Sequence, residues 1–334
     1  MTFRLTLFPA LTYLALVGCQ PPEPKGGTAG IGKGPDYDVV ISGGKLVDGA
    51  GNPWFYGDLA IRGEHIARIT PPGLLAKANA RQRIDATGKI VDPGFIDIQA
   101  QSVYEFTLGD GRVISSVTQG ITTAILGEGS TPAPTNDRII AAAAGFDAAM
   151  KPALEKFRGP RGFNAWLETM QRHGTSQNFG SFLGAATPRV YAKGEAQGEA
   201  TPAELDTIRT VVKNAMEDGA FGVASALIYP PANYASTAEL IEQAKAMSPY
   251  GGVYITHMRS EADRFLEAID EALRIGKEGH VPVEIYHFKA SGSRNFGKIA
   301  LAIAKIDSAR AAGQDITADM YLCRVKTKTR GAGF

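Results

Sequence analysis

After Pro93 the sequence alternates between short apolar stretches, typical of strands, and longer stretches with helical periodicity. We expect seven strands, over residues 95–99, 122–127, 181–186, 221–227, 253–258, 283–288 and 316–321. Four helices are expected, over residues 203–218, 237–247, 261–276 and 298–312. Thr201 and Glu204 form a capping-box pattern at the first helix, with Pro202 at its first position. This order of elements indicates an α/β fold with a parallel sheet, open or closed, one strand short of a (β/α)8 barrel.

Residues 37–92 have a different pattern, in which strand-like segments are separated by turn residues. Turns are expected at Asp48-Gly49, at Gly51-Asn52-Pro53 and at Arg62-Gly63-Glu64. This stretch is therefore expected to form a small N-terminal β-domain, which is completed by a partner segment from elsewhere. The fold class that follows is an incomplete TIM-like barrel over residues 93–322, preceded by this domain.

The first 19 residues indicate a targeting segment. A single Arg4 precedes an apolar stretch from Leu5 to Val17, which is too short to span a membrane and fits a signal peptide. Residues 16–19, Leu-Val-Gly-Cys, resemble the bacterial lipobox. That resemblance implies cleavage before Cys19, lipidation of its thiol, and a lipoprotein held at the membrane of the bacterial cell envelope, periplasmic or outer. The alternative is a plain secretory signal with an incidental cysteine.

Residues 20–36 are expected to be a flexible tether, because they are rich in proline and glycine. The second and last cysteine is Cys323, so the chain has no disulfide framework. With 35 basic and 34 acidic residues, the formal net charge is +1, and no nucleic-acid partner is expected. The 39 glycines and 19 prolines suit many short loops and argue against a coiled coil or a helical array.

Two histidines occupy matching positions in the alternating region. His257 closes GGVYITHMRSE and His287 closes the apolar part of VPVEIYHFKASG, about one strand and one helix apart. In a barrel this spacing brings both to the rim at the carboxyl ends of the strands, where active sites lie. Because the chain has only 5 histidines, the pair suggests a metal site. The alternative is a pair of buried, hydrogen-bonded histidines.

Several segments, taken together and in order, resemble the N-acyl-D-amino-acid deacylase (D-aminoacylase) group of the amidohydrolase superfamily. They extend from about residue 37 to 322 and read YDVVISGGKLVDGAG, IDATGKIVDPGFIDIQAQS, TQGITTAILGEG, EDGAFGVASALIYPP, YITHMRSE, HFKASGSRNFGK and DITADMY. The resemblance implies a metal-dependent (β/α)8 barrel with a small β-domain built from both ends of the chain.

The resemblance also assigns roles to residues. It implies that His257 and His287 bind a tightly held zinc, a role that suits neutral imidazole nitrogens. It implies that Lys289 holds the substrate carboxylate, the alternative being a lysine that is only solvated at the rim. It implies that Tyr229 contacts substrate, the alternative being a packed loop aromatic.

Two departures from the family pattern bear on the metal. Gln99 and Gln101 stand where many amidohydrolases have His-x-His, and amides are poor zinc ligands, so one zinc is expected rather than two. Where the family often has a cysteine ligand, the turn here is Gly127-Glu128-Gly129-Ser130. Since a carboxylate is a competent zinc ligand, we expect Glu128 to complete a His₂Glu set. The alternative is a loop carboxylate paired with a nearby base.

The third departure concerns the end of the chain. The resemblance implies an aspartate general base on an eighth strand, which this sequence does not reach. Residues 323–334 are basic and lack a strand or helix period, which suggests a truncated chain with an aberrant tail. The alternative is a short disordered tail. Asp319 is expected inside the seventh strand, where it does not replace the missing base.

The function expected from these features is zinc-dependent hydrolysis of the amide bond of small N-acyl-D-amino acids, weak or absent in a truncated chain. One alternative is a non-catalytic envelope lipoprotein that binds zinc or another ligand on the same scaffold. Another is a cyclic amidase similar to dihydroorotase or hydantoinase. The missing His-x-His and the YITHMRSE and HFKASG segments argue against the cyclic amidase.

Overall fold

The structure is a computed structural model that describes residues 35–143 and 149–321. The chain divides into two compact units, Met1–Pro93 and Gly94–Phe334, which are described separately. The expectations for the signal segment, for Cys19, for nearly all of the tether and for the 323–334 tail lie outside the described residues.

The first unit is a five-stranded sheet in the order β3-β2-β1-β4, with β5 also paired to β1. Its strands are β1 (Tyr37–Leu46), β2 (Phe55–Arg62), β3 (His65–Thr70), β4 (Ala80–Asp85) and β5 (Ile90–Val91). The expected turn at Gly63 is confirmed, because β2 and β3 form an antiparallel hairpin around it and Gly63 has φ 58°. The buried hydrophobic core of this sheet is small and consists of Val40, Ala60 and Leu75.

The second unit contains parallel strands in two hydrogen-bonded sets, β6-β7-β8 and β13-β12-β11-β10-β9. The strands are β6 (Phe95–Asp97), β7 (Ile121–Leu126), β8 (Asn178–Ser181), β9 (Leu183–Gly184), β10 (Gly222–Ala226), β11 (Val253–His257), β12 (Val283–Ile285) and β13 (Ile316–Ala318).

The expected strand over residues 181–186 is wrong in its extent. The structure has β8 paired with β7, then Phe182, whose N–H still donates to Leu126 O, and then β9 paired with β10. One passage of the chain therefore joins the two sets, and it ends early because a helix starts at Ala186. If β8 and β9 are counted as one strand, a strand is present at each of the seven expected positions. The strands expected over 95–99, 283–288 and 316–321 are each shorter than predicted.

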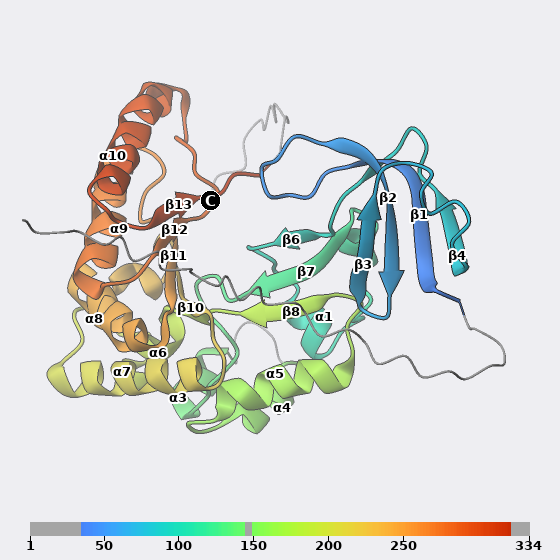
Figure 1. The fold of residues 1–334 in the computed structure, drawn as a ribbon. Coiled ribbons are helices and arrows are strands. Elements are labelled where there is room, and N and C mark those ends of the chain that lie inside the picture. Colours follow the sequence, from blue (N-terminus) through green and yellow to red (C-terminus); the bar gives the residue numbers. More distant parts are fainter. Residues whose placement is uncertain (1–34, 144–148, 322–334) are drawn as a thin grey trace, which may run out of the picture. The chain divides into compact units, whose positions relative to one another are not determined.

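Four long helices, α7 to α10, lie along one side of β10–β13 (Figure 1). They are α7 (Pro202–Glu217), α8 (Thr237–Met247), α9 (Phe265–Gly279) and α10 (Ile299–Ala311). The capping box of α7 is formed, with Thr201 N–H donating to Glu204 Oε2 at 2.7 Å. The expected start of α9 at residue 261 is wrong. Ser260 Oγ accepts the N–H groups of Ala262 and Arg264, so a turn precedes this helix.

The remaining helices were not predicted from the sequence. They are α1 (Val103–Thr107), α2 (Ile114–Val117), α3 (Asp137–Ala143), α4 (Lys151–Leu154), α5 (Gly162–His173), α6 (Ala186–Lys193) and the 3₁₀ turns η1 (Glu155–Phe157), η2 (Ala232–Tyr234), η3 (Ser248–Tyr250) and η4 (Ser293–Lys298). Within the described residues, no helix is long and apolar enough to cross a membrane.

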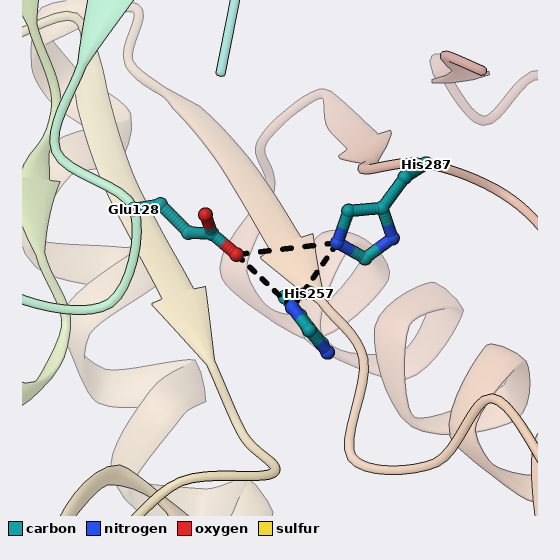
Figure 2. A group of neighbouring side chains, drawn as sticks. All are labelled: Glu128, His257 and His287. Carbon is teal, nitrogen blue, oxygen red and sulfur yellow. Dashed lines mark hydrogen bonds and ion pairs between the residues drawn. The ribbon is translucent and has the colours of Figure 1, made fainter. Parts of the chain in front are cut away.

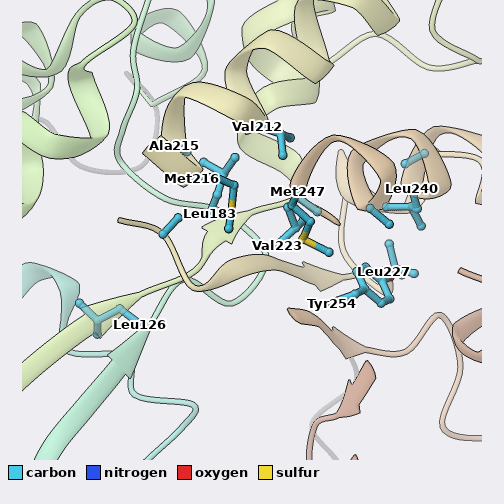
Figure 3. Packing of buried hydrophobic residues seen from close by; sticks show 14 of the residues in the cluster. Leu126, Leu183, Val212, Ala215, Met216, Val223, Leu227, Leu240, Met247 and Tyr254 are labelled. Atoms are coloured by element: carbon cyan, nitrogen blue, oxygen red, sulfur yellow. The ribbon is translucent and has the colours of Figure 1, made fainter. Parts of the chain in front are cut away.

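The central strands β10, β11 and β12 are largely buried on both faces, as parallel strands usually are. Val223 and Tyr254 belong to the large cluster that includes Val212 and Met216 of α7 and Met247 of α8 (Figure 3). Ala224 and Ile255, at the alternate strand positions, form a separate cluster with Phe182 and with Tyr286, which directly follows β12. This two-sided burial fixes the register of the strands, because a shift by one residue would exchange the two clusters.

A fully buried ion pair joins α6 to α8. The side chains of Arg189 and Glu239 are 0% and 1% exposed, and Arg189 Nη1 donates to Glu239 Oε2. Arg189 Nη2 also donates to the carbonyl oxygens of Ala196 and Gly198, at 3.2 and 2.7 Å. Burial raises the pKa of Glu239, and the neighbouring arginine only partly offsets this effect. A charge in this position is tolerated only while its partner remains.

Arg189→Ala should lower the free energy of unfolding by about 3–5 kcal/mol, because it leaves a buried carboxylate without a counter-charge. Urea unfolding of the full chain measures this loss. Arg274→Ala is the control, since Arg274 pairs with Glu278 on the surface of α9, and its unfolding curve should stay close to wild type. The double variant Arg189→Met with Glu239→Leu should recover most of the loss. Equal stability of Arg189→Ala and Arg274→Ala would contradict the assignment.

Candidate metal centre

The turn after β7 carries Glu128 between two glycines that the backbone requires. Gly127 has φ 109°, and a Cβ there would lie 2.2 Å from Phe182 O. Gly129 has φ 73°, and its Cβ would lie 2.9 Å from Ala226 Cβ. Only glycine combines these angles with such close approach. The tight turn places the Glu128 carboxylate at the carboxyl edge of the sheet.

The two histidines follow neighbouring parallel strands. His257 is the last residue of β11, as expected, whereas His287 lies two residues beyond the end of β12. His287 has φ 36°, a left-handed conformation that costs a non-glycine residue about 1–2 kcal/mol. Its N–H donates to Asp319 Oδ1 at 2.6 Å, and Phe288 N–H donates to Asp319 O at 2.8 Å. Asp319 thus holds the strained residue in place.

The side chains of Glu128, His257 and His287 converge on one point (Figure 2). His257 Nδ1 lies 3.0 Å from Glu128 Oε1 and 3.1 Å from His287 Nε2, and the remaining pair, His287 Nε2 and Glu128 Oε1, is 4.0 Å apart. Tetrahedral zinc with bonds of about 2.0–2.1 Å separates its ligand atoms by about 3.3 Å. The three atoms therefore have the spacing of one face of a zinc tetrahedron.

The surroundings of the three atoms also fit a cation. Their side chains are 9–12% exposed, and His257 Nε2 is buried without a hydrogen-bond partner. Burial acts to raise the pKa of Glu128, but its hydrogen bond with His257 and the nearby imidazoles outweigh burial and hold the pKa below its usual range. Glu128 is therefore an anion at neutral pH, the state that binds a metal.

Gln101 belongs to the site because it contacts Glu128, but it is not one of the three candidate metal ligands. Its Nε2 donates to Glu128 Oε2 at 2.6 Å, which leaves Oε1 directed at the histidines. The sequence identified this position only as a departure from His-x-His. The structure shows that its amide orients the carboxylate.

Glu261 is the acidic residue that the sequence analysis missed. Its Oε1 lies 2.7 Å from His287 Nδ1 and 2.6 Å from Lys289 Nζ. Burial acts to raise the pKa of Glu261, but the hydrogen bonds with His287 and Lys289 outweigh it, and the pKa is lowered. The sequence did contain a signal for this residue, because Glu261 follows His257 by four residues in YITHMRSE.

Asp319 lies just after β13 rather than inside a strand, so that expectation is wrong. Burial raises the pKa of Asp319, against the opposing hydrogen bond from the His287 N–H. Its second oxygen, Oδ2, is buried without a partner. Asp319 therefore reaches the same rim as the histidines.

The two expected substrate-contacting residues lie beside the cluster. Lys289 is in the loop after β12 rather than on the strand, and its side chain is 29% exposed. The Tyr229 ring meets the His257 ring edge-on, with centroids 5.5 Å apart, and Tyr229 is 57% exposed. Tyr229 also lines a cleft of about 400 Å³ together with Gln101 and Glu128. A larger cavity, of about 1030 Å³, lies between α9 and α10 and includes none of these residues.

No family model matches the sequence. The D-aminoacylase of Alcaligenes xylosoxydans xylosoxydans is 34% identical over 288 residues, which is 85% of this chain and 57% of the relative. A crystal structure of D-aminoacylase superposes with a TM-score of 0.74 at 34% identity, covering 85% of this chain and 58% of that one. An N-acyl-D-glutamate deacylase from Bordetella bronchiseptica, complexed with zinc and a phosphonate inhibitor, gives 0.73 at 30% identity over the same shares. The chain thus spans little more than half the length of these relatives.

The second unit has parallel strands with the Glu128–His257–His287 cluster at their carboxyl edge. Together with these likenesses, this arrangement identifies the fold as an amidohydrolase-type barrel. Within that class, the chain is similar to the N-acyl-D-amino-acid deacylases, with 32–35% identity over 85% of its length.

The wild-type chain should bind one zinc ion, and His257→Ala, His287→Ala and Glu128→Gln should each weaken binding by more than about 100-fold, beyond the usual effect of losing an outer hydrogen-bond partner. Competition with a coloured zinc chelator measures the affinity. His65→Ala, at an exposed histidine in β3, is the control and should bind zinc like wild type. Tight zinc binding that survives Glu128→Gln would remove Glu128 from the ligand set.

Proposed function

We propose that the chain carries the centre of a zinc-dependent hydrolase that cleaves the amide bond of N-acyl-D-amino acids. The observation that carries the proposal is the His₂Glu cluster with an amine, Lys289 Nζ, 3.0 Å from one of its imidazoles. A metal that activates a carbonyl and a cation that binds a carboxylate are the two groups that an N-acyl amino acid requires. The likeness to the deacylases supports this assignment.

In this proposal Glu128, His257 and His287 hold a single zinc. When bound, zinc would polarise the acyl carbonyl and lower the pKa of a water molecule beside it. Glu128 supplies the negative charge of the ligand set, while the neutral imidazoles leave the centre with a net positive charge. Gln101 keeps the carboxylate turned toward the centre through its 2.6 Å hydrogen bond.

Lys289 binds the carboxylate of the substrate in the same proposal. The ammonium donates to Glu261 Oε1 at 2.6 Å, and its other two contacts, to Nδ1 and O of His287, are longer at 3.0 and 3.3 Å. An incoming carboxylate would replace these longer contacts. Tyr229, edge-on to His257 and mostly exposed, offers an apolar ring to the rest of the substrate. Carbonyl, carboxylate and side chain would then each meet a fixed group, and three such contacts distinguish the D from the L form.

N-Acetyl-D-amino acids should bind to the zinc-loaded chain, and be hydrolysed by it, in preference to their L-enantiomers. Lys289→Met should weaken D-substrate binding by about 10- to 100-fold, the loss of one charge-assisted hydrogen bond of about 1.5–3 kcal/mol. Calorimetric titration and amine release measure these effects. Lys277→Met, at an exposed lysine of α9, is the control.

Two results would redirect the assignment. Turnover of hydantoin or dihydroorotate without any action on N-acyl-D-amino acids would favour a cyclic amidase. Zinc binding with neither hydrolysis nor D-substrate binding would favour a non-catalytic metal-binding lipoprotein.

We also propose that the chain is a lipid-anchored protein of the bacterial cell envelope, on the basis of residues 16–19, Leu-Val-Gly-Cys. Cells that express the full chain with labelled palmitate should incorporate the label and retain the protein in the membrane fraction. Cys19→Ser should abolish both, and Cys323→Ser should change neither. Equal labelling of Cys19→Ser and wild type would exclude lipidation at this residue.

A further inference from the structure

One oxygen atom, Glu261 Oε1, contacts both the Glu128–His257–His287 cluster and Lys289, the expected substrate-binding lysine. Glu261 Oε1 lies 2.7 Å from His287 Nδ1, 2.6 Å from Lys289 Nζ and 3.8 Å from His257 Nε2. The Glu261 side chain is 11% exposed, so water competes little for it. A carboxylate oxygen shared in this way constrains several groups at once.

The distances place Glu261 at the outer nitrogen of His287. Nε2 is the atom that lies 3.1 Å from His257 Nδ1 in the cluster, so binding a zinc there would use the lone pair of Nε2 and leave the hydrogen of the neutral ring on Nδ1. Glu261 Oε1 lies 2.7 Å from Nδ1, and an ionised carboxylate can accept that hydrogen. Lys289 Nζ also lies 3.0 Å from Nδ1, so the lysine and the carboxylate meet at the same nitrogen.

His257 presents the opposite nitrogen to the cluster. Its Nδ1 faces Glu128 Oε1 at 3.0 Å, so Nε2 is the outer nitrogen. That atom is buried, has no hydrogen-bond partner, and has Glu261 Oε1 at 3.8 Å. The same oxygen thus stands behind both rings, in contact with His287 and just beyond hydrogen-bond distance of His257.

The backbone around Glu261 holds this arrangement. Ser291 N–H donates to Glu261 O at 2.6 Å, which ties the loop after β11 to the loop after β12. Ser260 Oγ accepts the N–H groups of Ala262 and Arg264 and forms the turn that delays α9. Glu261 therefore projects from a fixed turn rather than from a helix surface.

We propose that Glu261 is a positioning residue that couples the metal site to the substrate-carboxylate site. Its Oε1 lies at His287 Nδ1, the nitrogen that would face away from a zinc bound through Nε2, and it fixes Lys289 Nζ beside the same ring. The inference rests on the proposed function, in which Glu128, His257 and His287 hold the zinc. Carboxylates behind ligating histidines have this orienting effect in other metal sites.

Zinc affinity, measured by chelator competition, tests the metal side of the coupling. Glu261→Ala should lower the affinity by about 10- to 100-fold. Glu261→Gln should lower it less, because an amide oxygen can still accept from Nδ1–H. Lys289→Met should change zinc affinity less than Glu261→Ala and should instead weaken binding of N-acetyl-D-amino acids. Glu267→Gln, at an exposed glutamate of α9, is the matched control and should behave as wild type.

A second measurement separates the effect from folding losses. Thermal unfolding of the zinc-free chain gives the midpoint of each variant. Glu261→Gln should keep the wild-type midpoint, so a lower zinc affinity in this variant would not come from loss of the fold.

The possible results distinguish a failure of the Glu261 coupling from a failure of the proposed zinc site. A wild-type chain that binds no zinc would overturn the proposed metal site and the coupling with it. Zinc bound equally well by wild type and Glu261→Ala would overturn the coupling alone. Equal losses of zinc affinity in Lys289→Met and Glu261→Ala would show that the carboxylate acts only through the lysine.

Discussion

Parallel pairing of β10, β11, β12 and β13 controls where His257, His287 and Asp319 lie. The ladder aligns Ala226 with His257, Thr256 with Ile285 and Ile285 with Ala318. Chain segments that are far apart in sequence therefore leave the sheet at nearly the same level and in the same direction. Since β10, β11 and β12 are largely buried on both faces, this alignment is maintained by packing as well as by backbone hydrogen bonds. The rim chemistry is a consequence of that alignment.

Irregular backbone is concentrated at this rim, where the regular elements end. Gly127 and Gly129 have positive φ around Glu128, and His287 has a left-handed conformation that its neighbours must stabilise. Asp319 provides part of that support by accepting the His287 N–H. Strained residues persist where the surrounding structure holds them, and they often mark functional sites. Here the strain brings side chains together that regular strands would have directed to opposite faces.

Much of the architecture could be predicted from the sequence, because burial patterns and caps are local signals. The bounds of α8 were predicted correctly, and the capping box at Thr201 marked the start of α7. The set Glu128, His257 and His287 was also named from sequence, with its ligand role still a prediction. The break between β8 and β9 could not be predicted, since it depends on which neighbour each half pairs with. The role of Glu261 could not be predicted, because the turn before α9 depends on backbone N–H groups that donate to the Ser260 side chain.

The hydrogen bond from Gln101 to Glu128 has a consequence for metal choice. It engages Oε2, so Glu128 offers only Oε1 and would coordinate through a single atom. Calcium prefers six to eight oxygen ligands and readily takes both atoms of a carboxylate, whereas zinc accepts four ligands of mixed nitrogen and oxygen type. A one-atom carboxylate beside two imidazoles therefore discriminates against large, oxygen-seeking cations. A glutamine that cannot bind the metal well can in this way contribute to the selection of the ion.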